Sequence, residues 1–234
     1  MHKRWKRRAL ALSLAALGLL WGCNSQNHTA APAVWQQVDG DQVVAEPLQF
    51  PHILPDSGLV VEELQCYNGP YWEDGSGEIV DNVAGLMVYN PTDRLIEFAS
   101  FALKQDSRRL YFFVYHLPPK SRCLVLEYNR IACDPSFVIA CDELCVRWDQ
   151  QEFSREYVDY VGLGPTMTII NRDARELRHV TVWYKQYIKT KDYYLGGAVY
   201  SAHVFYLQPG QQQTIWPEYY EAGCAKIVGI DLEL

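Results

Sequence analysis

Residues 85–104 read GLMVYNPTDRLIEFASFALK, and residues 166–185 read TMTIINRDARELRHVTVWYK. Aligned without a gap, the two stretches share three polar positions: Asn90 with Asn171, Arg94 with Arg175, and Lys104 with Lys185. Each stretch has an apolar run, a polar turn and a second, alternating run, which is the pattern of a strand, a turn and a strand. The repeat therefore predicts a fold built from two copies of one β unit.

Short apolar runs continue on both sides of each copy, separated by turn residues at the spacing of about 8–12 residues that is typical of β-sandwiches. The predicted fold class is all-β, with two tandem immunoglobulin-like antiparallel β-sandwich domains at 58–130 and 131–234. Residues 149–165 and 189–197 are predicted to be connections, and the second is about nine residues longer than its counterpart in the first copy. A single sandwich over 59–234 is the alternative.

Side-chain alternation along the second strand of each copy indicates which face is buried. One face is entirely apolar in both copies and is predicted to be the core: Ala99, Phe101 and Leu103, and Val180, Val182 and Tyr184. The other face carries Trp183 and Tyr187 with Lys185 between them. An exposed aromatic pair of this kind suits contact with a sugar ring or another protein. The alternative is that both rings pack beneath a loop or against the first domain.

The N-terminus has the pattern of an export signal, with a basic start and a short apolar run over residues 9–20. The run ends in Leu-x-Gly-Cys at 20–23, which resembles the lipobox of bacterial lipoproteins. We therefore predict a lipoprotein signal peptide at 1–22, lipidation at Cys23 and an extracytoplasmic chain anchored to the cell membrane by lipid. Residues 23–57 are rich in proline and small polar residues and are predicted to be a flexible tether.

The mature chain is acidic, because the signal takes away five basic residues and leaves 16 Lys and Arg against 28 Asp and Glu. This charge argues against nucleic acid as a partner. The predicted partners are the lipid bilayer, through the anchor, and an unidentified envelope protein or glycan.

Six cysteines remain besides Cys23, and an even number outside the cytosol permits disulfides. The candidate pairs are Cys141 or Cys145 with Cys224, and Cys66 with Cys123, and free thiols are the alternative. No second Cys or His pair accompanies Cys141 and Cys145 at ligand spacing, so no metal site is predicted there.

Two further motifs are Gly-Pro-Tyr-x-Glu-Asp-Gly-Ser at 69–76 and Gly-Gly-x-x-Tyr at 196–200. Together with Leu-x-Pro at 117–119, Leu-Gln-Pro-Gly at 207–210 and the paired asparagines, they make the chain similar to lipoproteins of gut Firmicutes. The repeat itself resembles the FxLYD or CARDB-like, immunoglobulin-like modules of bacterial surface lipoproteins. The resemblance implies a fold and a location; it carries no activity, cofactor or catalytic residue.

No signature of a catalytic nucleophile, phosphate loop or dinucleotide site is present, so no catalytic residue and no cofactor are predicted. Tyr71 and Trp72 in the first long loop join Trp183 and Tyr187 as candidate ligand-binding residues. The same loop gathers oxygen donors that suit calcium: Glu73, Asp74, Glu78, Asp81 and Asn82. Their spacing does not match an EF-hand, and a solvated loop is the alternative. The histidines of the folded part are interpreted as polar strand-end residues: His116, His179 and His203.

The predicted function is a non-enzymatic binding or spacer module for a protein or glycan at the cell envelope. The alternative is a small carbohydrate-active enzyme, or a calcium-dependent carbohydrate-binding protein, that uses Tyr71, Trp72 and the neighbouring acids.

Overall fold

The computed structural model describes residues 47–105, 107–134, 138–148 and 156–234, and its regular elements are all β-strands. Most strand pairs are antiparallel, and they form several sheets. The signal peptide, Cys23 and the tether up to residue 46 lie outside the described residues. Within the described ranges, no helix is long and apolar enough to cross a membrane.

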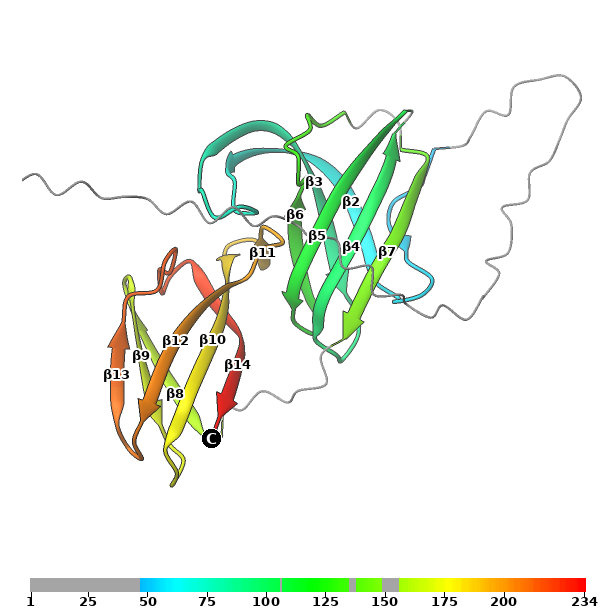
Figure 1. The fold of residues 1–234 in the computed structure, drawn as a ribbon. Coiled ribbons are helices and arrows are strands. Elements are labelled where there is room, and N and C mark those ends of the chain that lie inside the picture. Colours follow the sequence, from blue (N-terminus) through cyan, green and yellow to red (C-terminus); the bar gives the residue numbers. More distant parts are fainter. Residues whose placement is uncertain (1–46, 106, 135–137, 149–155) are drawn as a thin grey trace, which may run out of the picture. The chain divides into compact units, whose positions relative to one another are not determined.

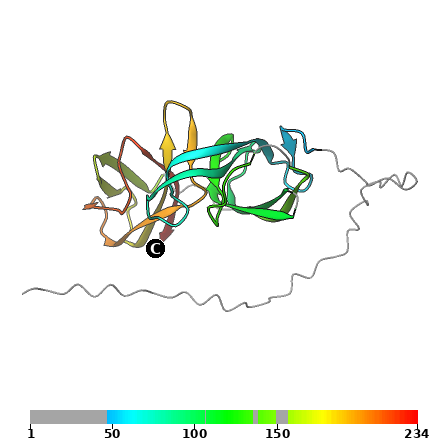
Figure 2. The same ribbon diagram turned by 90° about the horizontal axis from the view of Figure 1, so that it is seen from above.

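The first half of the folded chain consists of two layers around one core (Figures 1 and 2). One layer contains β1 (His52–Ile53), β2 (Val60–Pro70), β3 (Ile79–Asn90) and β6 (Ser121–Leu126). The other contains β5 (Arg108–Leu117), β4 (Ile96–Gln105) and β7 (Ala140–Trp148). The core between them is fully buried and purely apolar at its centre, with Leu86, Phe101 and Phe112 among its members.

The second half has a separate core between two further layers. One layer contains β8 (Val158–Leu163), β9 (Thr166–Asn171) and β13 (Gln212–Ile215). The other contains β10 (Leu177–Ile188), which pairs with β12 (Tyr200–Leu207) and with β14 (Ala225–Glu233). Val180, Val182 and Tyr184 point into this core, and Ala99, Phe101 and Leu103 point into the first one. All six are at most 1% exposed, so the predicted core face is confirmed in both copies.

The repeated asparagines have equivalent roles in the two halves. Asn90 Nδ2 donates to the carbonyls of Arg94 (2.8 Å) and Leu117 (3.3 Å). In the other copy, Asn171 Nδ2 donates to the carbonyls of Arg175 and Leu207, both at 2.8 Å. Both asparagines are fully buried, and a buried amide needs such partners. Each one therefore ties its own turn to a Leu-x-Pro segment, which begins at the last residue of β5 in the first half and of β12 in the second.

The structure differs from the predicted boundaries in three strands. β7 hydrogen-bonds to β4 from Ile96↔Trp148 to Lys104↔Ala140, so a boundary at residue 131 falls before a strand that belongs to the first half. β8 occupies part of the predicted connection at 149–165, and a short strand, β11 (Tyr193–Leu195), occupies part of the connection at 189–197. Both connections have polar and glycine residues that local pattern alone reads as loop.

β11 joins the two halves through backbone hydrogen bonds. It pairs antiparallel with the end of β10, at Tyr187↔Tyr194, and parallel with β6, at Tyr194↔Cys123 and Leu195↔Leu124. The strand order β3-β6-β11-β10-β12 is therefore one continuous sheet. The additional residues of the second copy thus build a strand between the halves.

Candidate functional site

A carboxylate in the first loop, Glu73, connects the two sequence motifs at 69–76 and 196–200. Its Oε1 accepts hydrogen bonds from the backbone N–H of Leu126 (2.7 Å) and Gly197 (2.8 Å), and its Oε2 accepts one from Ala198 (3.0 Å). Tyr200 adds a third link between the motifs, because its hydroxyl donates to the carbonyl of Trp72 at 2.8 Å. The two motifs therefore meet in space although they lie more than a hundred residues apart.

Lys185 is the cation of the same region, and it is 0% exposed. Its Nζ donates to three carbonyls: Tyr115 (3.0 Å), Gly197 (2.7 Å) and Ala198 (2.7 Å). Burial lowers the pKa of Lys185. Burial raises the pKa of Glu73 to about 7, although its backbone hydrogen bonds and the charge of Lys185 act to lower it. A buried charge is costly unless it is compensated by hydrogen bonds and by an opposite charge. Here both groups are hydrogen-bonded to the backbone, and the charge of each favours the charged form of the other.

The backbone at Gly196 and Gly197 approaches its neighbours too closely for a side chain. A Cβ at Gly197 would lie 1.7 Å from the carbonyl oxygen of Phe113, so only glycine fits there. Cys123 lies against the same turn, where its Sγ donates to the carbonyl of Gly196 at 3.1 Å. Burial raises the pKa of this thiol to about 12, which keeps it protonated and unreactive.

This packing covers the face of β10 that was expected to be exposed. Trp183 and Tyr187 are half-buried and pack against the core of the first half. The indole of Trp183 stacks on His116, with 4.8 Å between ring centroids, and donates to Asp231 Oδ2 at 2.6 Å. Trp183 and Tyr187 therefore pack against the first half, which was the alternative to an exposed pair, because β11 pairs with both β6 and β10.

Tyr187 nevertheless lines a pocket of about 250 Å³ beside β11. One wall is the turn at 118–122, which includes Lys120 and Arg122, and the other comes from β11 and β14. Tyr194 lies against Tyr187 with 5.3 Å between ring centroids. The Tyr187 hydroxyl donates to Asp192 Oδ1, so the phenol ring is held from both ends.

The pocket lining carries three basic side chains, Lys120, Arg122 and Lys226, and one acidic side chain, Asp192. Lys120 is paired with Asp93 at 3.2 Å, and Arg122 is paired with Glu62 at 2.9 Å. Lys226 is exposed, and the ion pairs found among the described residues do not include it. Its Nζ lies 4.5 Å from the ring centroid of Tyr187 and 5.8 Å from that of Tyr194. A cation over two aromatic rings is well placed to receive an anion without first breaking a salt bridge.

Tyr71 and Trp72, the other candidate ligand-binding residues, hold their own loop in place. Tyr71 is 1% exposed, and its hydroxyl donates to the carbonyls of Glu127 (3.0 Å) and Tyr128 (2.9 Å). Trp72 is half-buried and meets Tyr219 edge-on at 6.1 Å. In this arrangement the ring of Tyr71 has no free face for a sugar, and that of Trp72 has little.

The acids of the first loop make contacts within the protein. Asp74 and Glu78 both pair with the guanidinium of Arg130, at 2.6 and 2.7 Å. Hydrogen bonds to Ser76 and to Arg130, together with the charge of Arg130, lower the pKa of Asp74 despite its partial burial. Within the described part of the chain, no group of three or more His, Cys, Asp or Glu side chains is placed to hold a metal ion.

The expected disulfides are not formed, and the structure has six free thiols: Cys66, Cys123, Cys133, Cys141, Cys145 and Cys224. Cys66 is exposed whereas Cys123 is buried against Gly196, which separates the first expected pair. Cys141 and Cys145 lie on β7 in the first half, and Cys224 precedes β14 in the second.

The roles of Lys226 and Tyr194 were not predicted from sequence, nor was the meeting of Glu73 and Lys185 at the backbone of Gly197 and Ala198. Their signal was present in the longer connection at 189–197, whose extra residues form β11, and in the Gly-Gly motif that follows it. Comparisons of the chain with protein-family models, with curated proteins and with solved structures found no match.

Proposed function

We propose that this chain is a lipid-anchored, extracytoplasmic binding protein that is not an enzyme. Its two cores and its repeated asparagine turns support two tandem immunoglobulin-like β-sandwich domains. The lipobox-like Cys23 supports the anchor. The pocket beside Tyr187 supports the binding role. The observation that carries it is Lys226, a cation that lies over two tyrosine rings and takes part in none of the ion pairs found among the described residues.

The ligand that fits this pocket best is an acidic sugar of an envelope glycan. Basic side chains lie on both walls and outnumber the acidic Asp192, which favours a negative group, and Lys226 takes part in none of the ion pairs found among the described residues. The volume of about 250 Å³ lies below the range of about 300–1,000 Å³ that is usual for drug-sized ligands. One sugar ring is of suitable size.

The binding role is tested with the intact chain on an array of acidic and neutral glycans. We expect acidic glycans to bind and Lys226→Ala to weaken that binding by about 10- to 100-fold, because a hydrogen bond to a charged group is worth about 1.5–3 kcal/mol. Lys191→Ala is the matched control, since Lys191 also lies over a tyrosine, Tyr193, at 6.0 Å but does not line the pocket. Equal binding by wild type and Lys226→Ala would contradict the proposal. If the chain binds a protein and none of the glycans, the ligand is a protein and the proposed acidic glycan is wrong.

The alternative of a carbohydrate-active enzyme or calcium-dependent lectin gains no support from a specific contact. Its acids, Asp74 and Glu78, are occupied by Arg130, and its aromatics support the loop. The two functions differ in one measurement. Replacing Asp74 and Glu78 together by alanine should leave acidic-glycan binding within about twofold of wild type, whereas an enzyme would lose hydrolysis of a polysaccharide substrate.

The anchor gives a separate prediction. Cys23→Ala should move the protein from the membrane fraction to the soluble extracytoplasmic fraction, because the proposed lipid is attached through that sulfur and two acyl chains are enough for stable anchoring. Fractionation followed by immunoblotting measures the change, and Ser25→Ala is the neighbouring control. Retention of Cys23→Ala in the membrane fraction would show that another segment holds the chain there.

A further inference from the structure

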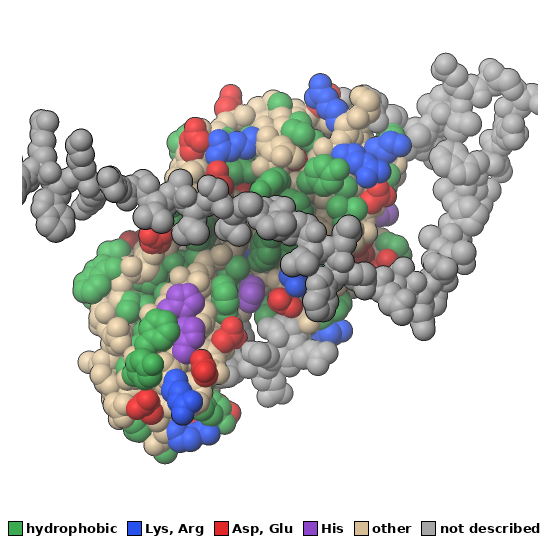
Figure 3. Space-filling model, viewed as in Figure 1, with side chains coloured by type: hydrophobic (Ala, Val, Ile, Leu, Met, Phe, Trp, Pro, Cys, Tyr) green, Lys and Arg blue, Asp and Glu red, His purple; other side chains and the backbone are tan. Residues whose placement is uncertain are grey.

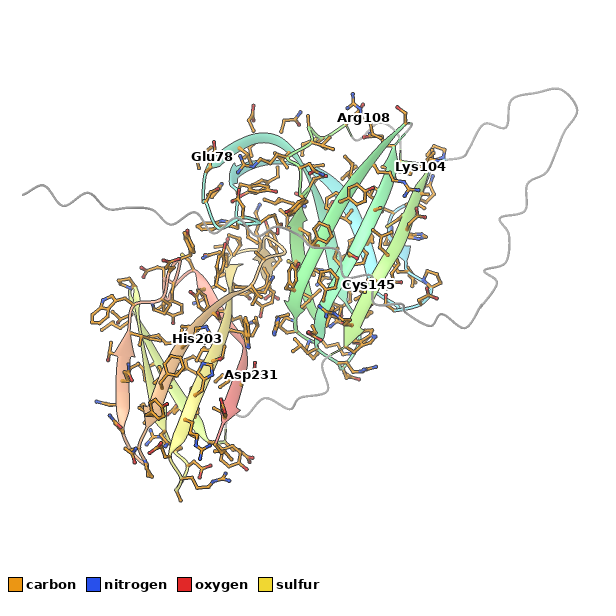
Figure 4. The ribbon with its side chains drawn as sticks, in the orientation of Figure 1. Glu78, Lys104, Arg108, Cys145, His203 and Asp231 are labelled. Atoms are coloured by element: carbon orange, nitrogen blue, oxygen red, sulfur yellow. The ribbon has the colours of Figure 1, made fainter. Side chains whose placement is uncertain are left out.

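Two histidines face each other on the solvent side of β10 and β12, toward the opposite end of β10 from Tyr187. The strand register pairs His203 with Thr181 and His179 with Phe205, so the two histidines are diagonal neighbours on one face of the sheet. His179 Nε2 and His203 Nδ1 are 3.0 Å apart. Figure 3 shows histidine side chains in contact on this surface, and Figure 4 labels His203.

This separation matches the spacing of two ligands on a metal ion. Zinc–nitrogen bonds of about 2.0–2.1 Å at a tetrahedral angle place the two nitrogens about 3.3 Å apart. A small movement of the rings therefore admits a metal ion between the two nitrogens, in place of their direct contact. We propose that His179 and His203 bind one divalent transition-metal ion of the kind that imidazole favours, such as zinc, nickel or copper.

The neighbouring side chains hold both rings in this orientation. Thr181 Oγ1 lies 3.3 Å from His179 Nε2 and 3.2 Å from His203 Nδ1. Ser201 Oγ lies 3.1 Å from the other nitrogen of His203, and Phe205 stacks on His179 with 4.5 Å between centroids and 6° between planes. The contact of Ser201 with His203 Nε2 is of the outer kind that orients a metal-binding imidazole, whereas Thr181 Oγ1 lies against the two nitrogens proposed to bind the metal and would move aside when the ion enters.

The protein provides two ligands at this site, and water completes the coordination. No third His, Cys, Asp or Glu of the described part of the chain stands with them as a metal-binding group. Carboxylates lie on the same face one strand further along, since Asp231 pairs with Thr181 and Glu233 pairs with His179 (Figure 4). Their charge favours a cation at the histidines.

Zinc is the probe for the test, added to the intact chain and followed by NMR of the histidine ring nitrogens. We expect one equivalent of Zn²⁺ to shift the ring signals of His179 and His203 together. His179→Gln and His203→Gln keep a polar side chain at each position, and each should weaken the zinc affinity by about 10- to 100-fold or more, since disturbing even an outer-shell contact costs that much. His52→Gln on β1 is the control, and it should leave the affinity unchanged.

Two results would overturn the proposal. In the first, Zn²⁺ leaves both ring signals in place or shifts other histidines instead, which would make the pair a hydrogen-bonded contact only. In the second, both glutamine variants bind zinc as tightly as the wild type, which would assign the metal to the free thiols.

Discussion

Lys185→Met should lower the free energy of unfolding by about 3–5 kcal/mol, the cost of removing one partner from a buried charged group. The change leaves the carbonyls of Tyr115, Gly197 and Ala198 without the donor that Lys185, itself 0% exposed, provides. It also removes the cation whose charge favours the ionised form of the half-buried Glu73 carboxylate. Methionine has a similar length, so the expected loss comes from the polar contacts and not from a cavity.

The repeat supplies a matched control for this measurement. Lys104 occupies the aligned position in the first copy, but it is exposed at the end of β4 (Figure 4). Lys104→Met should therefore change stability by no more than about 0.5 kcal/mol, as is usual for surface substitutions. Urea unfolding followed by tryptophan fluorescence compares the two variants. Similar losses at both positions would mean that the charge of Lys185 contributes nothing specific to the junction.

The stability of the wild type should fall as the pH rises from about 4.5 to about 7, with a limiting slope of about 1.4 kcal/mol per pH unit from one residue, Glu73. Burial raises the pKa of its carboxyl from 4.5 in the unfolded chain to about 7 in the folded one. The folded chain thus holds this proton more tightly. The resulting stabilisation is complete below the unfolded pKa and is lost as the pH passes the folded pKa.

Glu73→Gln removes the titration and should flatten this part of the profile. The variant cannot accept all three backbone N–H groups of the wild type, so it is also expected to be less stable at every pH. The slope is therefore the informative quantity. Asp81→Asn, an exposed carboxylate nearby, is the control and should keep the wild-type slope. An unchanged slope in Glu73→Gln would assign the pH dependence to other groups.

Local pattern was sufficient for the parts of the fold that depend on one strand and its turn. Alternation at Phe101 and Val182 gave the buried faces correctly, because the period of a strand fixes which side chains share a face. The paired asparagines were recognised as equivalent, and the structure shows them in equivalent hydrogen bonds. These features need only short-range information.

The parts that were missed depend on which segment lies across from a strand. Lys104 and Lys185 occupy aligned positions, yet one is exposed and the other is buried, because β11 and the first half cover only the second. No periodicity in residues 189–197 separates a three-residue strand from a loop. The two histidines illustrate the same limit, since His179 and His203 are 24 residues apart and meet only through the register of β10 and β12.

The position of β11 between β6 and β10 also changes what a duplication of this kind achieves mechanically. Two copies joined by a linker alone would rotate freely relative to each other. Force applied to a ligand on one copy would then not be transmitted through the structure of the other. Pairing of Tyr194 and Leu195 with β6 of the first half instead restricts the motion of one copy relative to the other. Tension on a ligand held at Tyr187 would then pass through the shared sheet to the N-terminal end of the chain, where the proposed membrane attachment lies.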